Sequence, residues 1–282
     1  MRIRPISEDR SDCGEGPIWN PYTGIVSWVD IAGNKWHQVG LENRQKSMTF
    51  AVPTIIGAIV ERKSGGYFAA VKEGFASLDI NGNYFTEIDF LPKDHRMNDA
   101  KVDSRGRFWA GSTTIDFSPG FGQLHLLDTD FSLRVMESNL TLPNGLGWSP
   151  DNKSFYLVDS MQRTMWRYDF DEESAAISNR EAMVRFPDDG SVPDGLTVTS
   201  DGLVIVAMWD GSRLEVFNPD GSSSTTIPMP VKRPSSCTFA GDRLIVTSAA
   251  GEQDLESYPL SGLTLLVEGL PYTGPASAAF NG

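Results

Sequence analysis

The chain has 282 residues, enough for one large domain or two ordinary ones with a substantial buried core. It carries 24 Lys and Arg against 37 Asp and Glu, a formal charge of -13, which would repel phosphate backbones and anionic lipid alike. We therefore expect neither nucleic acid nor a membrane surface as a partner. No apolar stretch approaches the roughly 18 residues that a membrane span needs, and no apolar run follows Arg2 and Arg4 as in a signal peptide. We expect a cytoplasmic protein.

Cysteine and histidine usage excludes several kinds of catalytic site. Cys13 and Cys237 are too few for a disulfide framework and lack C-x-x-C spacing, so we interpret them as reduced core residues. His37, His95 and His125 lie far apart and do not form the H-E-x-x-H pattern of zinc proteases. The sequence also has no G-x-S-x-G elbow and no P-loop, which removes the usual signals of serine hydrolases and nucleotide hydrolases.

Apolar residues occur in short runs broken by Gly, Pro, Asn, Asp and Ser, a pattern typical of β-strands rather than long helices. Each of six similar runs follows a turn sequence and an earlier strand, as in GEGPIWNPYTG and LPNGLGWSPDNK, and precedes a third strand and a weaker fourth. The six runs span residues 24–31, 66–71, 107–112, 154–160, 203–209 and 243–249. The repeat therefore consists of four strands.

Four strands in a repeat of roughly 40 to 50 residues predict a six-bladed β-propeller, whose four-stranded antiparallel blades surround a central channel. A β-sandwich is the alternative, but it has fewer strands than this repeat supplies. We predict one propeller domain over residues 1–282. Its ring would close where a strand near Arg2–Ile6 pairs with strands around Leu263–Val267. Because a closed ring has no exposed edge strand, we expect a monomer.

The first strand of every propeller blade lines the channel, so equivalent residues of the six first strands converge near its axis. Aligning each segment on the apolar residue four places further along identifies these equivalent positions. They are Glu15, Ile56, Asn98, Asn144, Asp194 and Ser235. Glu, Asn, Asn and Asp at four of the six positions indicate a site in the channel.

A divalent cation would offset the repulsion between carboxylates packed into such a channel. Glu15, Asn144 and Asp194 offer hard oxygen ligands suited to Ca²⁺, Mg²⁺ or Mn²⁺, with Zn²⁺ as a further option. The alternative interpretation is structural, because Pro143-Asn144-Gly145 and Pro193-Asp194-Gly195 are also ordinary turn tripeptides. Their coincidence at one register of the repeat favours a single metal site.

Four segments, GEGPIW, RMNDAKVDSRGRFWAG, LPNGLGWSPD and VPDGL, resemble those of the SMP-30/gluconolactonase family, also called the regucalcin family. The resemblance covers nearly the whole chain and implies a six-bladed propeller with one channel metal. The family's Glu, Asn and Asp metal ligands correspond to Glu15, Asn144 and Asp194. Its R-x-N-D motif implies that Arg96 and Asn98 bind substrate.

Some members of the family place an acidic residue in the loop that follows, where this chain has Asp116. The resemblance therefore implies that Asp116 also contacts substrate, although the surrounding loop lacks a matching motif. A solvent-exposed loop carboxylate is the alternative for Asp116, and a surface ion pair is the alternative for Arg96. Phe117 and Phe121 either line the channel mouth or pack between blades.

The resemblance implies hydrolysis of a sugar lactone, of the gluconolactone or pentonolactone kind, to its aldonic acid. The metal would polarise the lactone carbonyl, and Asp194 would accept a proton from the attacking water. Activation of that water by the metal itself is the alternative. Two other functions stay open: a metal-dependent esterase or phosphotriesterase, and a non-catalytic calcium-binding regulatory protein.

Overall fold

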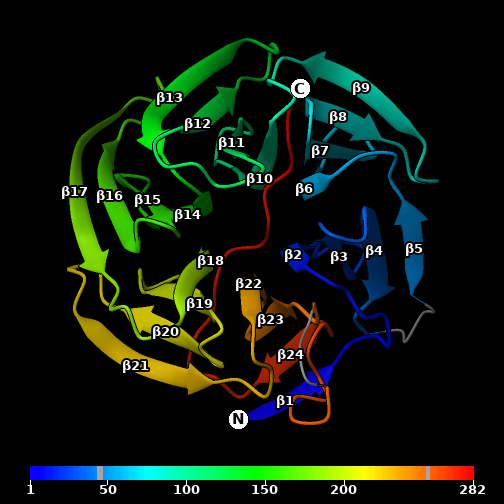
Figure 1. The fold of residues 1–282 in the computed structure, drawn as a ribbon, viewed down its shortest axis with the longest axis vertical. Coiled ribbons are helices and arrows are strands. Elements are labelled where there is room, and N and C mark those ends of the chain that lie inside the picture. Colours follow the sequence, from blue (N-terminus) through cyan, green and yellow to red (C-terminus); the bar gives the residue numbers. More distant parts are fainter. Residues whose placement is uncertain (43–46, 252–254) are drawn as a thin grey trace.

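The computed structural model describes residues 1–42, 47–251 and 255–282, and it confirms the predicted propeller. Six four-stranded antiparallel sheets surround a central axis (Figure 1). The described residues contain no α-helix, and hence no helix long and apolar enough to cross a membrane.

The strands of the first five blades run outward from the axis in chain order, and the sixth blade ends outside with the N-terminal strand. The innermost strands are β2 (Gly14–Trp19), β6 (Ile56–Glu61), β10 (His95–Val102), β14 (Pro143–Trp148), β18 (Val192–Val198) and β22 (Pro234–Ala240). The second strands are β3 (Ile25–Asp30), β7 (Tyr67–Val71), β11 (Phe108–Thr114), β15 (Ser154–Asp159), β19 (Val204–Trp209) and β23 (Arg243–Ser248). The third are β4 (Lys35–Gly40), β8 (Gly74–Leu78), β12 (Gly122–Leu127), β16 (Thr164–Phe170), β20 (Arg213–Phe217) and β24 (Leu265–Glu268). The outermost are β5 (Met48–Ala51), β9 (Tyr84–Asp89), β13 (Leu133–Leu140), β17 (Ile177–Arg185), β21 (Ser223–Pro228) and β1 (Arg2–Pro5).

The N-terminal strand closes the ring as predicted. β1 is the outermost strand of the sixth blade and pairs antiparallel with β24, so that Arg2 faces Glu268 and Pro5 faces Leu265. The last blade is thereby completed by the first residues of the chain. β24 therefore has a fourth strand beside it, as the third strand of each of the other five blades does.

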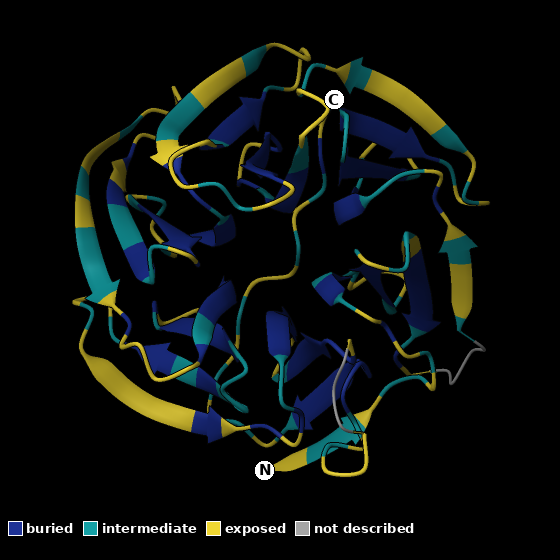
Figure 2. Ribbon diagram, viewed as in Figure 1, coloured by how far each residue is buried: buried dark blue, intermediate teal, exposed yellow. Residues whose placement is uncertain are grey.

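The hydrophobic core lies between neighbouring blades rather than within one sheet. One cluster joins Val60 and Phe68 of the second blade to Met97 and Phe108 of the third. Inner strands are buried, whereas most residues of the outermost strands are exposed (Figure 2). This gradient explains why the fourth strand of each repeat has the weakest apolar pattern in the sequence.

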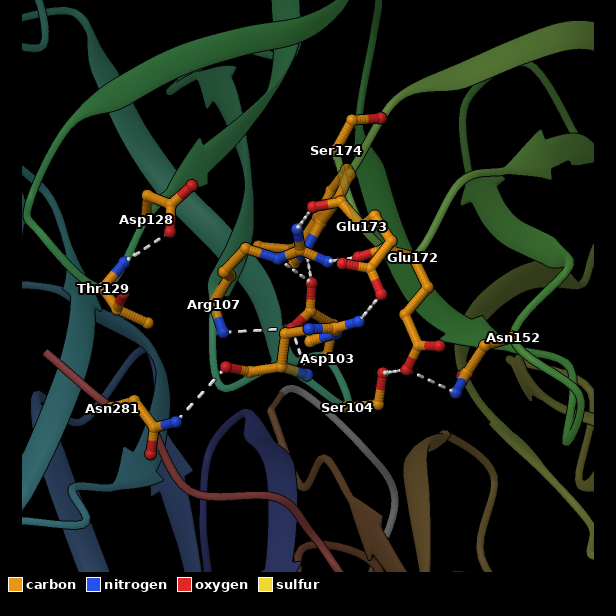
Figure 3. A network of polar contacts seen from close by, with 12 residues as sticks. Asp103, Ser104, Arg107, Asp128, Thr129, Asn152, Glu172, Glu173, Ser174 and Asn281 are labelled. Carbon is orange, nitrogen blue, oxygen red and sulfur yellow. Dashed lines mark hydrogen bonds and ion pairs between the residues drawn. The ribbon is translucent and has the colours of Figure 1, made fainter.

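A buried ion pair ties the turn between β10 and β11 to the fourth blade (Figure 3). Asp103 accepts a hydrogen bond from Arg107 Nε at 2.7 Å and from Trp109 Nε1 at 2.9 Å. Arg107 also donates to the carbonyl of Glu172 at 2.7 Å and to that of Glu173 at 3.3 Å. Since Asp103 and Arg107 are both buried, this network fixes two blades against each other.

The C-terminal segment, residues 269–282, crosses one end of the channel (Figure 1). The amide of Ser200 in the fifth blade donates to the carbonyl of Thr273 at 2.7 Å. The amide of Trp19 in the first blade donates to Ser277 Oγ at 3.2 Å. The sequence analysis did not anticipate this crossing segment.

Candidate functional site

Every innermost strand is irregular at the channel end where it begins. In β2, β10, β14 and β18, two residues of the innermost strand lie opposite one of its neighbour; for example, Gly16 and Pro17 lie opposite Trp28, between the Glu15–Val29 and Ile18–Ser27 pairs. β6 and β22 also gain one residue. An extra residue of this kind re-aims the local side chains and often lies next to a functional site. The predicted site positions coincide with these β-bulges.

Glycines next to the site positions let the innermost strands approach closely. A Cβ on Gly145 would collide with the backbone of Leu196, and one on Gly195 would collide with Ser236. The third blade differs, because Asp99 stands where the first, second, fourth and fifth have glycine. A buried carboxylate therefore lies at a position where most blades carry no side chain.

The structure brings the three predicted metal ligands together. Asn144 Nδ2 donates to Asp194 Oδ1 and, at 3.1 Å, to Ser160 Oγ. Glu15 and Asp194 lie close enough for the charge of Asp194 to act on the Glu15 carboxyl group. Glu15 and Asn144 are each 6% exposed and Asp194 is 5% exposed.

The electrostatics of this cluster favour a bound cation. Burial raises the pKa of Glu15 well above its usual range, and the charges of Asp194 and Asp99 raise it further. Burial also raises the pKa of Asp194, again assisted by Asp99. Asn144 Oδ1 is buried and has no hydrogen-bond partner among the described residues, so it is free to coordinate an ion. Two crowded carboxylates and an unpaired amide oxygen fit a divalent, oxygen-preferring metal ion.

Within the described ranges, no group of three or more His, Cys, Asp or Glu side chains is arranged to hold a metal ion. The candidate set contains only two carboxylates, and its third member is an amide. Amide oxygens are common ligands of Ca²⁺ but are unlike the ligands of structural zinc sites.

Arg96 and Asn98, the predicted substrate residues, lie beside this cluster. Arg96 Nη1 donates to Asn98 Oδ1 at 2.8 Å, and Asn98 Nδ2 donates to the carbonyl of Pro143 at 3.0 Å. Burial lowers the pKa of Arg96, while the nearby charges of Glu15 and Asp194 act in the opposite direction. A cationic fork of hydrogen-bond donors therefore faces the same polar centre as the carboxylates.

Asp116 lies in the loop after β11, next to Phe117. It is exposed, and its Oδ1 accepts hydrogen bonds from the amide of Ser118 at 3.1 Å and from Ser118 Oγ at 2.9 Å. It lines a surface hollow of about 340 Å³ with Asp94, Ile115 and Phe121. Among the described residues it makes no hydrogen bond to Arg96 or to the metal set, so its contact with substrate stays a prediction.

Cys13 lies close to the predicted site, which was not expected from the sequence. This thiol is free, as predicted, but Cys13 is half-buried and not the core residue that we expected. It lies close enough to the site for the charges of the carboxyl groups there to act on it. Burial raises its pKa well above the usual range, and the charges of Glu15 and Asp194 add to the rise. Its position two residues before Glu15 in the sequence could have indicated that it lies near the site.

A cavity of about 460 Å³ lies at the other end of the channel beneath the C-terminal segment. Its lining includes Ile18, Trp148 and Val198 from the far ends of innermost strands, together with Asp99 and Lys101. None of the three predicted metal ligands lines it. We place the candidate site at the end where the innermost strands begin, because the unpaired and mutually repelling polar groups gather there.

Comparison with known sequences identifies the family of this chain. A profile of the SMP-30/Gluconolactonase/LRE-like region matches residues 13–250. The chain belongs to the SMP-30/gluconolactonase family. Within the family it is 30% identical to pentonolactonase XacC of Haloferax volcanii over 90% of this chain and 87% of that protein. It is also 30% identical to regucalcin of Oryctolagus cuniculus, over 97% and 96% of the two chains.

Solved structures of similar proteins have the same fold. A luciferin-regenerating enzyme superposes with a TM-score of 0.92 at 26% identity, over 99% of both chains. A calcium-binding regucalcin from Agrobacterium tumefaciens superposes with a TM-score of 0.93 at 22% identity, over 99% of this chain and 97% of the other. The family propeller is therefore conserved in this chain along its whole length.

Proposed function

We propose that this protein is a metal-dependent lactonase that hydrolyses a sugar lactone to its aldonic acid. The observation that carries the proposal is the buried set of Glu15, Asn144 and Asp194, with crowded carboxylates and an unpaired amide oxygen, beside the guanidinium of Arg96. The similarity to a pentonolactonase supports the reaction class.

In this proposal the oxygens of Glu15, Asn144 and Asp194 hold one divalent cation, which supplies Lewis acidity toward the lactone carbonyl. Asp194 accepts a proton from the attacking water while that water's oxygen bonds to the carbonyl carbon. The bond from this carbon to the ring oxygen then breaks, and the proton passes to the released ring oxygen. Arg96 and Asn98 orient the substrate, because sugar hydroxyls need both donors and acceptors around them.

The proposal includes further predictions for this chain: a cytoplasmic location, a monomer, and Ca²⁺, Mg²⁺, Mn²⁺ or Zn²⁺ as the metal. The substrate is an aldonolactone of the pentono or hexono series, and Asp116 would reach its outer hydroxyls. Hydroxyl stereochemistry is recognised by the loops at the channel mouth, which differ most among proteins of one fold.

Proton release from a panel of aldono-1,4- and aldono-1,5-lactones tests the proposal. Chelator-stripped protein should be inactive, and one of the four metals should restore hydrolysis above the metal-only rate. Asp194→Asn should lower kcat by about 10²- to 10⁴-fold, since it removes the proton acceptor. Asp220→Asn, in an exposed turn between β20 and β21, is the matched control and should be as active as the wild-type protein.

Two rival functions are outcomes of the same experiment. Similarity to regucalcins favours a calcium-binding protein as the second candidate. Folded protein that binds Ca²⁺ without accelerating any lactone would support that candidate and overturn the lactonase. Faster hydrolysis of aryl esters or phosphotriesters than of every lactone would instead identify an esterase.

A further inference from the structure

Two buried aspartates occupy equivalent places in the first and fourth blades. Asp30 ends β3 and Asp159 ends β15, and their exposed fractions are 2% and 0%. The sequence separation from Glu15 to Asp30 equals that from Asn144 to Asp159. Each aspartate pairs across its hairpin with the residue immediately before a predicted metal ligand, since Gly14 faces Asp30 and Pro143 faces Asp159.

In the first blade, Asp30 binds the backbone that leads into Glu15. Its Oδ2 accepts the amide of Asp12 at 3.1 Å, and its Oδ1 accepts the amide of Cys13 at 2.9 Å. The same Oδ1 accepts the amide of Gly33 at 3.1 Å. The carboxylate thus ties the segment before Glu15 to the turn after β3.

In the fourth blade, Asp159 accepts the same three hydrogen bonds from residues at equivalent positions. Its Oδ2 accepts the amide of Thr141 at 2.7 Å, and its Oδ1 accepts those of Leu142 and Gln162, each at 3.2 Å. The backbone bonds beside it also match, since the residue after each aspartate donates to a carbonyl of the same approach segment. Asn144 follows two residues after Leu142.

Three other blades lack this aspartate. At the same hairpin register, the third blade has Ser112, the fifth has Met208 and the sixth has Ser248. Asp194, the predicted ligand of the fifth blade, instead accepts a hydrogen bond from Asn144 Nδ2, and its charge acts on the Glu15 carboxyl group. Fixing those two residues therefore also constrains the third.

We propose that Asp30 and Asp159 are positioning residues of the metal site, a role that rests on the proposed function. Each holds three backbone amides in place, so that the Glu15 carboxylate and the Asn144 amide enter the channel in a set orientation. A ligand set held in this way needs less reordering when the cation binds.

The test is metal affinity, measured by calorimetric titration of chelator-stripped protein with Ca²⁺, Mg²⁺, Mn²⁺ and Zn²⁺. Asp30→Asn and Asp159→Asn keep the shape of the side chain but place an NH₂ group against backbone donors. Each should weaken metal binding by about 10- to 100-fold, as loss of outer-sphere partners typically does. The metal concentration for half-maximal lactone hydrolysis should rise in parallel, with less change in KM at saturating metal.

Asp103→Asn is the matched control, because Asp103 is also a buried aspartate that accepts backbone amides, from Arg105 at 2.9 Å and Arg107 at 3.0 Å. It lies at the opposite end of its blade, in the turn between β10 and β11. This variant should lose thermal stability while its metal affinity stays within about twofold of the wild-type value.

Folded Asp30→Asn and Asp159→Asn proteins with wild-type metal affinity would overturn the positioning role and leave the proposed function intact. An equal loss of affinity in Asp103→Asn would overturn it as well, because the effect would then be general destabilisation. Absence of metal binding by the wild-type protein would overturn both proposals. If an asparagine variant is unstable, Asp30→Glu provides a second carboxylate variant, and its affinity should lie between those of wild type and Asp30→Asn.

Discussion

Phe117 is the residue at the channel mouth whose backbone indicates strain. Its φ of 58° lies in the left-handed region, which costs a non-glycine residue on the order of 1 kcal/mol. Its ring lies 5.7 Å from the guanidinium carbon of Arg96. The turn therefore holds an aromatic face against the cation that we expect to bind substrate.

Phe117→Ala and Phe117→Gly separate the ring from the strain. Both variants lose the cation–π contact, so KM for a lactone substrate should rise roughly two- to fivefold in each. Only the glycine variant relieves the backbone strain, and it should be more stable than the alanine variant by about 1 kcal/mol. Steady-state kinetics and urea unfolding measure the two effects. Unchanged KM in both would show that the ring does not support Arg96.

His125 determines part of the pH dependence of stability. Burial lowers its pKa to about 4, while a histidine in an unfolded chain titrates near about 6.5. Between these values the unfolded chain binds more protons, so the free energy of unfolding falls as pH is lowered through this window. The imidazole contacts Ser112 Oγ at 2.9 Å and cannot be charged there without loss of stability.

We expect His125→Gln to be less sensitive to acid than the wild-type protein. Between pH 7.5 and 4.5 the wild-type protein should lose about 2–3 kcal/mol more of its unfolding free energy than the variant does. Urea unfolding at several pH values gives both curves. If the free energies of unfolding of the two proteins fall in parallel between pH 7.5 and 4.5, His125 is not the source of the acid sensitivity.

At the scale of strands and turns, the contact between the third and fourth blades depends on Asp103. Asp103→Ala leaves the buried Arg107 guanidinium without its carboxylate, which should destabilise the protein by about 3–5 kcal/mol. The neighbouring pair of Arg105 and Glu173 is exposed, so Glu173→Ala should cost less than about 1 kcal/mol. Urea unfolding measures the free energy of unfolding that each variant loses. Equal losses would show that the buried network of Asp103 is not the main contact between the two blades.

How far the site could be predicted depends on what carried each signal. Asn98, Asn144 and Asp194 could be aligned because turn residues and a following apolar residue repeat in every blade. The β-bulges at these positions could not be predicted, because an extra residue is recognised only when the register of the paired strand is known. Asp30 was equally hidden, because its partners are backbone amides, which have no sequence signature.

On the scale of the whole molecule, both ends of the chain hold the ring together. The role of the N-terminal strand could be predicted from the sequence, and that of the C-terminal segment could not. The pairing of β1 with β24 followed from the need to cover an edge strand and is confirmed. The C-terminal segment was not predicted, because its Pro, Gly and Ala residues lack strand periodicity and its course depends on contacts with several blades. Its Phe280 is fully buried in the core between the second and third blades.

Ring closure by β1 should contribute measurably to stability and solubility. Removing residues 1–6 deletes the β1 pairing and the packing of Ile3 against the sixth-blade core, and leaves β24 as an unpaired edge. We expect a loss of at least about 3 kcal/mol in unfolding free energy, from lost apolar burial and strand hydrogen bonds. We also expect self-association through the exposed edge, visible in sedimentation velocity.

The double variant Arg2→Gln and Arg4→Gln is the control for this deletion. It keeps the strand but removes its charges, including the half-exposed ion pair of Arg4 with Glu268 at 3.5 Å, which is worth at most about 1 kcal/mol. A large loss in the deletion with little loss in the control assigns closure to strand pairing and to Ile3. Equal losses would assign it to the charges. A deletion variant that stays monomeric and stable would show that contacts between blades hold the ring without β1.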